Sequence, residues 1–243
     1  MTSAATGFRV LALSAGLSTP SSTRMLTDQL TREAAASLGA DGAAVEVSTV
    51  ELREYAHDLA DALLTRFPSE RLSLVIEQVR AADAVIAVTP VFNVGPSGLF
   101  KMFFDALDTE LWKGKPVLLG ATAGTARHSL AIDYAIRPMF GYLKSEVVPT
   151  VVFAASADFG ADTEGQADEQ PLAARVRRAA GELATMVRVG LGETSPRADG
   201  GAATGSGTSS DAEPGHDAAV PARPALDAEF SDFVPMGTLL GRG

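Results

Sequence analysis

The sequence predicts an α/β fold in which helices cover both faces of a doubly wound parallel sheet. Strand-like and helix-like segments alternate along the first ~190 residues as five β–α units, and such alternation favours a parallel sheet. The segment 84–88 (Ala-Val-Ile-Ala-Val) is apolar throughout, which is typical of a strand that is covered on both faces. We therefore expect residues 1–192 to form one domain.

The first half of this domain divides into two strands, each followed by a helix. An apolar run at 8–13 is the first strand, and Ser21 or Ser22 caps the helix after it, whose leucines share one face. Valines at 45–50 mark the second strand. The next helix begins at Ser69 and carries its apolar side chains on one side.

The second half continues the same alternation. After the strand at 84–88, the hydrophobic pattern predicts a helix at 99–111, a strand at 116–120, a helix at 129–144, a strand at 147–154 and a helix at 172–189.

The composition changes sharply near Glu193. Residues 193–229 are dominated by Gly, Ala, Ser, Thr, Asp and Pro, and their few large apolar side chains cannot offset the entropy of ordering. We expect a disordered acidic linker there. Two phenylalanines and two leucines return within 230–243. We expect this apolar C-terminal segment to dock on the domain or on a neighbouring subunit; the alternative is a free tail that recruits a partner.

The composition also excludes several classes of function. A net charge of −10 argues against nucleic acid or an anionic membrane as partner. Cysteine is absent, which excludes disulfides, thiolate nucleophiles and sulfur-based metal sites. His57, His128 and His216 lie far apart in the sequence, so we expect no metal site. No apolar run approaches the ~20 residues that span a bilayer, and residues 1–9 do not form a secretory signal. We expect a cytoplasmic protein.

The loops after the first, third and fourth strands are the candidate binding loops, because ligands of open parallel sheets bind beyond the carboxyl ends of the strands. The first loop, 14–24, is rich in hydroxyl groups and leads into a helix N-terminus. This combination favours phosphate binding, and ordinary helix capping is the alternative. The loop contains neither a Walker motif nor GxGxxG.

The second and third loops offer different chemistry. Prolines stiffen the loop 89–98, and its apolar side chains and backbone N–H groups suit the edge of a flat heterocycle; a rigid turn is the alternative. Small residues in the loop 121–129 allow a ligand to approach the backbone closely. Arg127 places a positive charge where an anionic cofactor would sit, whereas His128 is more typical of a structural histidine.

The motifs of these loops resemble the NADPH-dependent FMN reductase family. Residues 90–105 follow the pattern Pro-x-Phe…Ser-Gly-x-x-Lys-x-x-x-Asp, which is fairly specific for the superfamily. The chain is similar to one branch of it, the actinobacterial FMN reductases that are paired with luciferase-like monooxygenases, in the runs 121–130, 137–138, 148–150 and 233–240. The resemblance covers residues 8 to 190. Gly95-Pro96 stands where many members carry Ser-Tyr or a similar pair.

The resemblance implies a flavodoxin-like fold, with a five-stranded parallel sheet in three α/β/α layers. It implies a reaction in which hydride passes from nicotinamide C4 to flavin N5, so the flavin carries the chemistry and no catalytic side chain is needed. The implied cofactors are FMN and either NADPH or NADH, and the reduced flavin would supply a flavin-dependent monooxygenase. The implied contacts are Ser14, Ser21, Ser22 and Thr23 on the flavin phosphate, Pro90, Val91, Phe92 and Asn93 on the isoalloxazine ring, and Thr122, Ala123 and Gly124 on its pyrimidine edge.

Two alternatives share this fold. A flavodoxin-like electron carrier fits the acidic charge, but the first loop is longer than a flavodoxin's and lacks its alternating Thr/Gly pattern. A quinone or azo-dye reductase is the closest enzymatic alternative. A response-regulator receiver is excluded, because Thr89-Pro90 stands where its phosphate-accepting Asp would be.

We also expect a homodimer or homotetramer. The helix at 99–111 carries apolar side chains on more than one face, and a surface helix needs only one apolar stripe.

Overall fold

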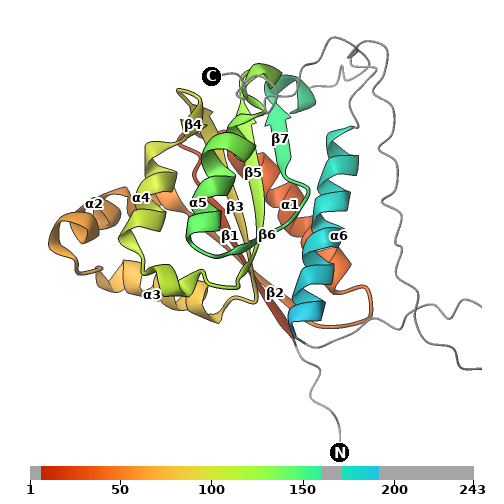
Figure 1. Ribbon diagram of the computed structural model, residues 1–243, viewed down its shortest axis with the longest axis horizontal. Helices are drawn as coiled ribbons and strands as arrows, with labels where there is room; N and C mark the ends of the chain where they lie inside the picture. Colours follow the sequence, from red (N-terminus) through yellow and green to blue (C-terminus); the bar gives the residue numbers. More distant parts are fainter. Residues whose placement is uncertain (1–6, 160–170, 192–243) are drawn as a thin grey trace, which may run out of the picture. The chain divides into compact units, whose positions relative to one another are not determined.

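A five-stranded parallel sheet forms the centre of the protein (Figure 1). The computed structural model describes residues 7–159 and 171–191. The strands are β1 (Phe8–Ser14), β2 (Val45–Glu51), β3 (Ala84–Phe92), β5 (Pro116–Ala123) and the split edge strand β6 (Glu146–Val147) and β7 (Val152–Ala155). Their order is β2-β1-β3-β5, with β6 and then β7 pairing along β5. This is the flavodoxin-like order, and it confirms the predicted fold class.

Helices cover both faces of this sheet. One layer contains α1 (Ser22–Leu38) and α6 (Leu172–Gly190). The other contains α2 (Ala56–Thr65), α3 (Glu70–Ala81), α4 (Gly98–Ala106) and α5 (Arg137–Tyr142). Side chains of the central strands alternate between the two layers: Leu11 and Leu13 join one hydrophobic core, and Val10 and Ala12 join the other. This alternation explains why the strands are apolar throughout.

Two predicted elements are divided in the structure, each at a proline. The predicted helix 129–144 contains a π-helix (Ile132–Ile136), in which the N–H of Arg137 bonds to Ile132 O, before α5 begins. Pro138 has no N–H for a regular helical bond at this point. The predicted strand 147–154 becomes β6 and β7, with Pro149 between them.

Other boundaries also differ from the predictions. The predicted helix 99–111 ends earlier, as α4, and a 3₁₀ turn at Thr109–Leu111 follows it. Residues 51–68 carried no predicted element, yet they hold a 3₁₀ turn (Leu52–Tyr55) and α2. α2 buries only Leu59 and Ala62, so its apolar stripe is narrow and gives a weak signal.

The apolar faces of α4 are largely buried within the chain itself. Phe100, Phe103 and Phe104 are at most 3% exposed. The Phe104 ring lies 4.7 Å from that of Trp112 and 4.8 Å from that of Phe140, between centroids. The oligomer was predicted because the helix carries apolar side chains on more than one face. Packing within one chain explains these side chains, so the oligomeric state stays a prediction.

The predicted linker 193–229 and the C-terminal segment 230–243 lie outside the described residues, as does His216. Within 7–159 and 171–191, no helix is both long and apolar enough to cross a bilayer.

Candidate functional site

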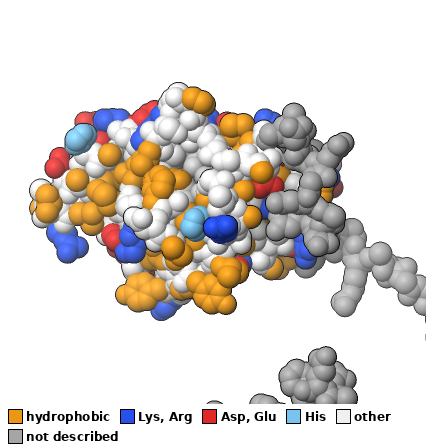
Figure 2. All heavy atoms as spheres, turned by 90° about the horizontal axis from the view of Figure 1, so that it is seen from above, with side chains coloured by type: hydrophobic (Ala, Val, Ile, Leu, Met, Phe, Trp, Pro, Cys, Tyr) orange, Lys and Arg blue, Asp and Glu red, His pale blue; other side chains and the backbone are white. Residues whose placement is uncertain are grey.

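The candidate site lies at the carboxyl edge of the sheet. β1, β3 and β5 are parallel neighbours, so the three candidate loops meet at one edge, which is uppermost in Figure 1. Figure 2 shows this face from above. Its visible part consists largely of hydrophobic side chains and of the white surface of backbone and other side chains, with a few charged side chains among them. Such a surface suits a flat, partly apolar ligand.

The first loop is closely packed around Gly16. A Cβ atom on Gly16 would lie 2.2 Å from Ser21 Oγ and 3.3 Å from Thr23 Cβ, so a side chain there would displace the Ser21 hydroxyl from its position. Ser14, the last residue of β1, is fully buried, and its hydroxyl has no hydrogen-bond partner among the described residues. Because a buried hydroxyl without a partner costs free energy, Ser14 Oγ is suited to bind a ligand.

The N-terminus of α1 supplies further donors. Ser21 caps the helix, and its hydroxyl accepts a hydrogen bond from the N–H of Arg24 at 3.2 Å. The N–H groups of Ser22 and Thr23, at the start of the helix, have no carbonyl one turn earlier to bond to. No acidic residue lies in the first turn of α1, so no side chain there neutralises the positive end of the helix dipole. This end of α1 is suited to an anion such as phosphate.

Thr23 and Thr122 join the first loop to the third. Their hydroxyl oxygens lie 2.8 Å apart, and each residue is 2% exposed. The sequence assigned both of these hydroxyls to the flavin, and in the structure they are partners of each other. A pair of hydroxyls shares one hydrogen, so one of the two protons is left for another acceptor. The bond holds the two loops in a fixed relative position.

An ion-pair network supports the outer side of the first loop. Arg24 bonds to Asp28 and to Glu51, at 2.7 Å in each case. The hydrogen bonds that Arg24 donates to Glu51 and Asp28 raise the pKa of Arg24 above its usual value. Arg53 lies 4.0 Å from Glu51 and donates to Ser18 O at 3.3 Å. This network positions the loop, and its cations are already paired with carboxylates.

The second loop is a hairpin with a strained tip. β3 extends to Phe92 and pairs antiparallel with β4 (Gly95–Pro96). The turn residues Asn93 and Val94 have φ angles of 50° and 66°. A two-residue hairpin turn with positive φ at both positions is typical of type I′, and such values are unfavourable for a β-branched residue such as valine. Phe92 is 47% exposed and Val94 is 65% exposed. The hairpin thus presents apolar area at the edge, and backbone strain of this kind clusters at ligand sites.

The third loop is exposed and carries a positive charge that has no partner within the described part of the chain. Ala123 ends β5 and is half-buried, and Gly124 has no atom within 4 Å of a Cβ placed on it. Arg127 is exposed in the short 3₁₀ turn Ala126–His128. It forms no hydrogen bond or ion pair with any residue that the structure describes. The backbone and this guanidinium are accessible to a ligand.

All the predicted site residues lie on the three loops or the strand ends that carry them, but they differ in exposure. The buried ones are Ser14, Thr23, Val91 and Thr122; the half-buried ones are Ser21, Pro90 and Ala123; the exposed ones are Ser22, Phe92, Asn93, Gly124 and Arg127.

Two features of the site were not predicted, namely the close packing at Gly16 and the left-handed backbone of Val94. Gly16 could have been found from its place directly after the first strand. The positive φ of Val94 has no counterpart in the sequence, because valine is not a residue that favours such a turn.

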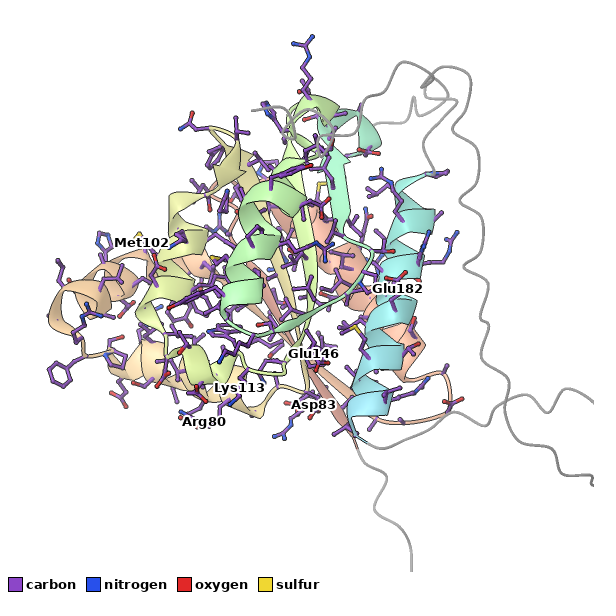
Figure 3. The ribbon with its side chains drawn as sticks, in the orientation of Figure 1. Arg80, Asp83, Met102, Lys113, Glu146 and Glu182 are labelled. Carbon is purple, nitrogen blue, oxygen red and sulfur yellow. The ribbon has the colours of Figure 1, made fainter. Side chains whose placement is uncertain are left out.

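A cavity of about 570 Å³ lies at the opposite, amino edge of the sheet. Its lining includes basic and acidic side chains, among them Arg80, Asp83, Lys113 and Glu146, which Figure 3 labels. It is separate from the three loops. Ligands of this fold class bind at the carboxyl edge, so we place the candidate site there and not in this cavity.

Comparison with known proteins gives consistent results. The sequence profile of a family described as NADPH-dependent FMN reductase matches residues 8–160. An "FMN reductase (NADPH)" of Pseudomonas aeruginosa is 34% identical over 179 residues, which cover 74% of this chain and 92% of that protein. An "NADH-dependent FMN reductase SfnF" of Pseudomonas fluorescens is also 34% identical, over 73% of this chain and 91% of that protein.

Solved structures of oxidoreductases are also similar to this chain. An oxidoreductase from Corynebacterium diphtheriae is 45% identical, covers 74% of this chain and 96% of its own, and superposes with a TM-score of 0.69. The apo form of an NADH:FMN oxidoreductase (EMOB) is 22% identical, with a TM-score of 0.59 and coverage of 73% and 89%. At that identity the second likeness shows the fold alone.

Proposed function

The chain belongs to the NADPH-dependent FMN reductase family and is an NAD(P)H:FMN oxidoreductase, and we propose that it binds FMN across the three loops at the carboxyl edge. The observation that carries this placement is the first loop. It combines a fully buried hydroxyl, on Ser14, that has no partner among the described residues with a glycine, Gly16, at which a side chain would clash with the Ser21 hydroxyl. Both lie beside the N-terminus of a 17-residue helix.

The first loop would hold the phosphate of FMN. Ser22 and the first N–H groups of α1 are available as donors, and Ser21 lies beside them as the helix cap. Several donors converging on one phosphate, with the helix dipole behind them, explain how a protein of net charge −10 binds an anion. Thr23 and Thr122 would act mainly by fixing the loops.

The second and third loops would hold the ring system. Pro90, Val91 and Phe92 supply apolar contact, and the turn at Asn93 offers backbone N–H groups to the ring edge. The accessible backbone around Ala123 and Gly124 suits the pyrimidine side, which carries carbonyl and N–H groups. When bound, flavin supplies the hydride-accepting chemistry, and the protein's contribution is binding and orientation.

We propose that the reduced flavin is used by a flavin-dependent monooxygenase. The support is the sequence resemblance to reductases that are paired with luciferase-like monooxygenases. Among the described residues of the candidate edge, Leu17 is 54% exposed and Leu130 is 63% exposed. Exposed apolar side chains of this kind would let a second protein dock close to the flavin.

Steady-state kinetics test the activity. The purified protein should oxidise NADPH or NADH catalytically in the presence of free FMN, with FAD and riboflavin as comparison acceptors. An electron carrier would exchange electrons without catalytic nucleotide oxidation. Faster turnover with quinones or azo dyes than with FMN would instead favour the alternative enzyme class.

A further inference from the structure

The relatives leave the identity of the hydride donor open. The two Pseudomonas relatives are equally similar to this chain, yet one is named for NADPH and the other for NADH. The two nucleotides differ by one phosphate, on the 2′ position of the adenosine ribose. A preference must therefore come from a group that recognises this phosphate, and such a group is usually an arginine.

The carboxyl edge holds several basic side chains, and most of them are already neutralised. Arg24 is paired with Asp28 and Glu51, and Arg53 lies near Glu51. At the end of β7, Arg175 pairs with Asp158 at 2.6 Å. A guanidinium that is paired in this way binds a phosphate less favourably than a free one, because the phosphate must compete with the carboxylate for its N–H groups.

Arg127 differs from these arginines. Its side chain is exposed and has no hydrogen bond or ion pair with residues 7–159 or 171–191. Gly124, Thr125 and Ala126, which precede it, are exposed and small, so nothing on the loop itself blocks the approach of a nucleotide. Within the described residues, the groups of this edge that remain available to bind an anion are therefore Arg127 in the third loop and the N–H groups at the N-terminus of α1.

We propose that Arg127 binds the 2′-phosphate of NADPH and makes NADPH the preferred hydride donor. This inference rests on the proposed function, in which the N-terminus of α1 is occupied by the phosphate of FMN. A second anion at the same edge then requires a second cation. The planar guanidinium can bind a phosphate through two parallel hydrogen bonds, which a lysine cannot reproduce.

The test uses Arg127→Gln and Arg127→Lys, with Arg32→Gln as control. Arg32 is exposed in the middle of α1. Its replacement by Gln removes the same charge as Arg127→Gln, but at a distance from the loops. Kinetics at saturating FMN should show kcat/KM for NADPH falling at least about 10- to 100-fold in Arg127→Gln, which corresponds to the loss of one charge-assisted hydrogen bond. The loss in Arg127→Lys should be smaller. The kinetics with NADH, the KM for FMN and the Arg32→Gln control should stay unchanged.

Calorimetry gives an independent readout. Adenosine 2′,5′-bisphosphate should bind the wild type more tightly than 5′-AMP, and Arg127→Gln should remove the difference. An equal loss with NADPH and NADH, or a loss confined to FMN, overturns the proposal. A wild type that reduces FMN but prefers NADH also overturns it and leaves the proposed function standing. Failure to reduce FMN with either nucleotide would instead refute the function.

Discussion

Ser21 and Ser22 allow the phosphate site to be tested against its closest alternative, ordinary helix capping. Ser21 Oγ accepts the N–H of Arg24, so this hydroxyl supports the helix whether or not a ligand binds. Ser22 is exposed, is the first residue of α1 and does not cap it. The double variant Ser21→Ala/Ser22→Ala removes both hydroxyls, and each single variant separates their roles.

The magnitudes follow from these positions. A hydrogen bond to a charged group is worth about 1.5–3 kcal/mol. Loss of two therefore lowers the affinity for FMN by about two to four orders of magnitude. Riboflavin has no phosphate, so its affinity should change little. Loss of the cap costs about 0.5–2 kcal/mol of unfolding free energy. Ser21→Ala should show this cost, and Ser22→Ala should weaken FMN binding without it.

Quenching of flavin fluorescence measures both affinities, and urea unfolding measures the stability. Ser69→Ala is the matched control. Ser69 caps α3, accepting from Leu72 N at 3.1 Å, and also bonds to Asp58. Its replacement should cost at least as much stability as Ser21→Ala and leave FMN affinity unchanged. If the double variant loses affinity for FMN and riboflavin equally, the hydroxyls do not recognise the phosphate and the reasoning fails.

Two further predictions concern stability. Val94→Gly should raise the unfolding free energy by about 0.5–1 kcal/mol, because glycine adopts the left-handed φ of 66° without strain. The control Val47→Gly, in the edge strand β2, should lower the unfolding free energy. A lower unfolding free energy in both variants would contradict the argument. Burial disfavours ionisation of Glu182, but hydrogen bonds from Thr150 and Arg178 outweigh it and lower its pKa. Glu182, labelled in Figure 3, therefore stabilises the fold at neutral pH, and this contribution is lost as the pH falls below the usual glutamate value of about 4.3. The stability difference between wild type and Glu182→Gln, measured in urea, should shrink between pH 7 and pH 3; a constant difference would show that ionisation is irrelevant.

The position of the candidate site could be predicted from the sequence, but the roles of its residues could not. Hydroxyls after the first strand and apolar residues after the third both follow from local sequence, and the parallel sheet brings them to one edge. Thr23 illustrates the limit of such prediction. Its hydroxyl looked available for a phosphate, yet it bonds to Thr122, 99 residues away. A contact at that separation leaves no trace in the neighbouring sequence.

By itself, the sequence determined the order and type of the main elements, because hydrophobic periodicity and helix caps are local properties. Ser69 begins the helix that it was predicted to begin, and the apolar strand 84–88 lies in the middle of the sheet. The tertiary structure decided what depends on distant neighbours. It buried the faces of α4 against Trp112 and Phe140, left the Ser14 hydroxyl without a partner among the described residues and gave Val94 a left-handed backbone conformation. Packing energy and hydrogen bonding are shared among residues that are far apart in the chain, so these outcomes are fixed only when the layers come together.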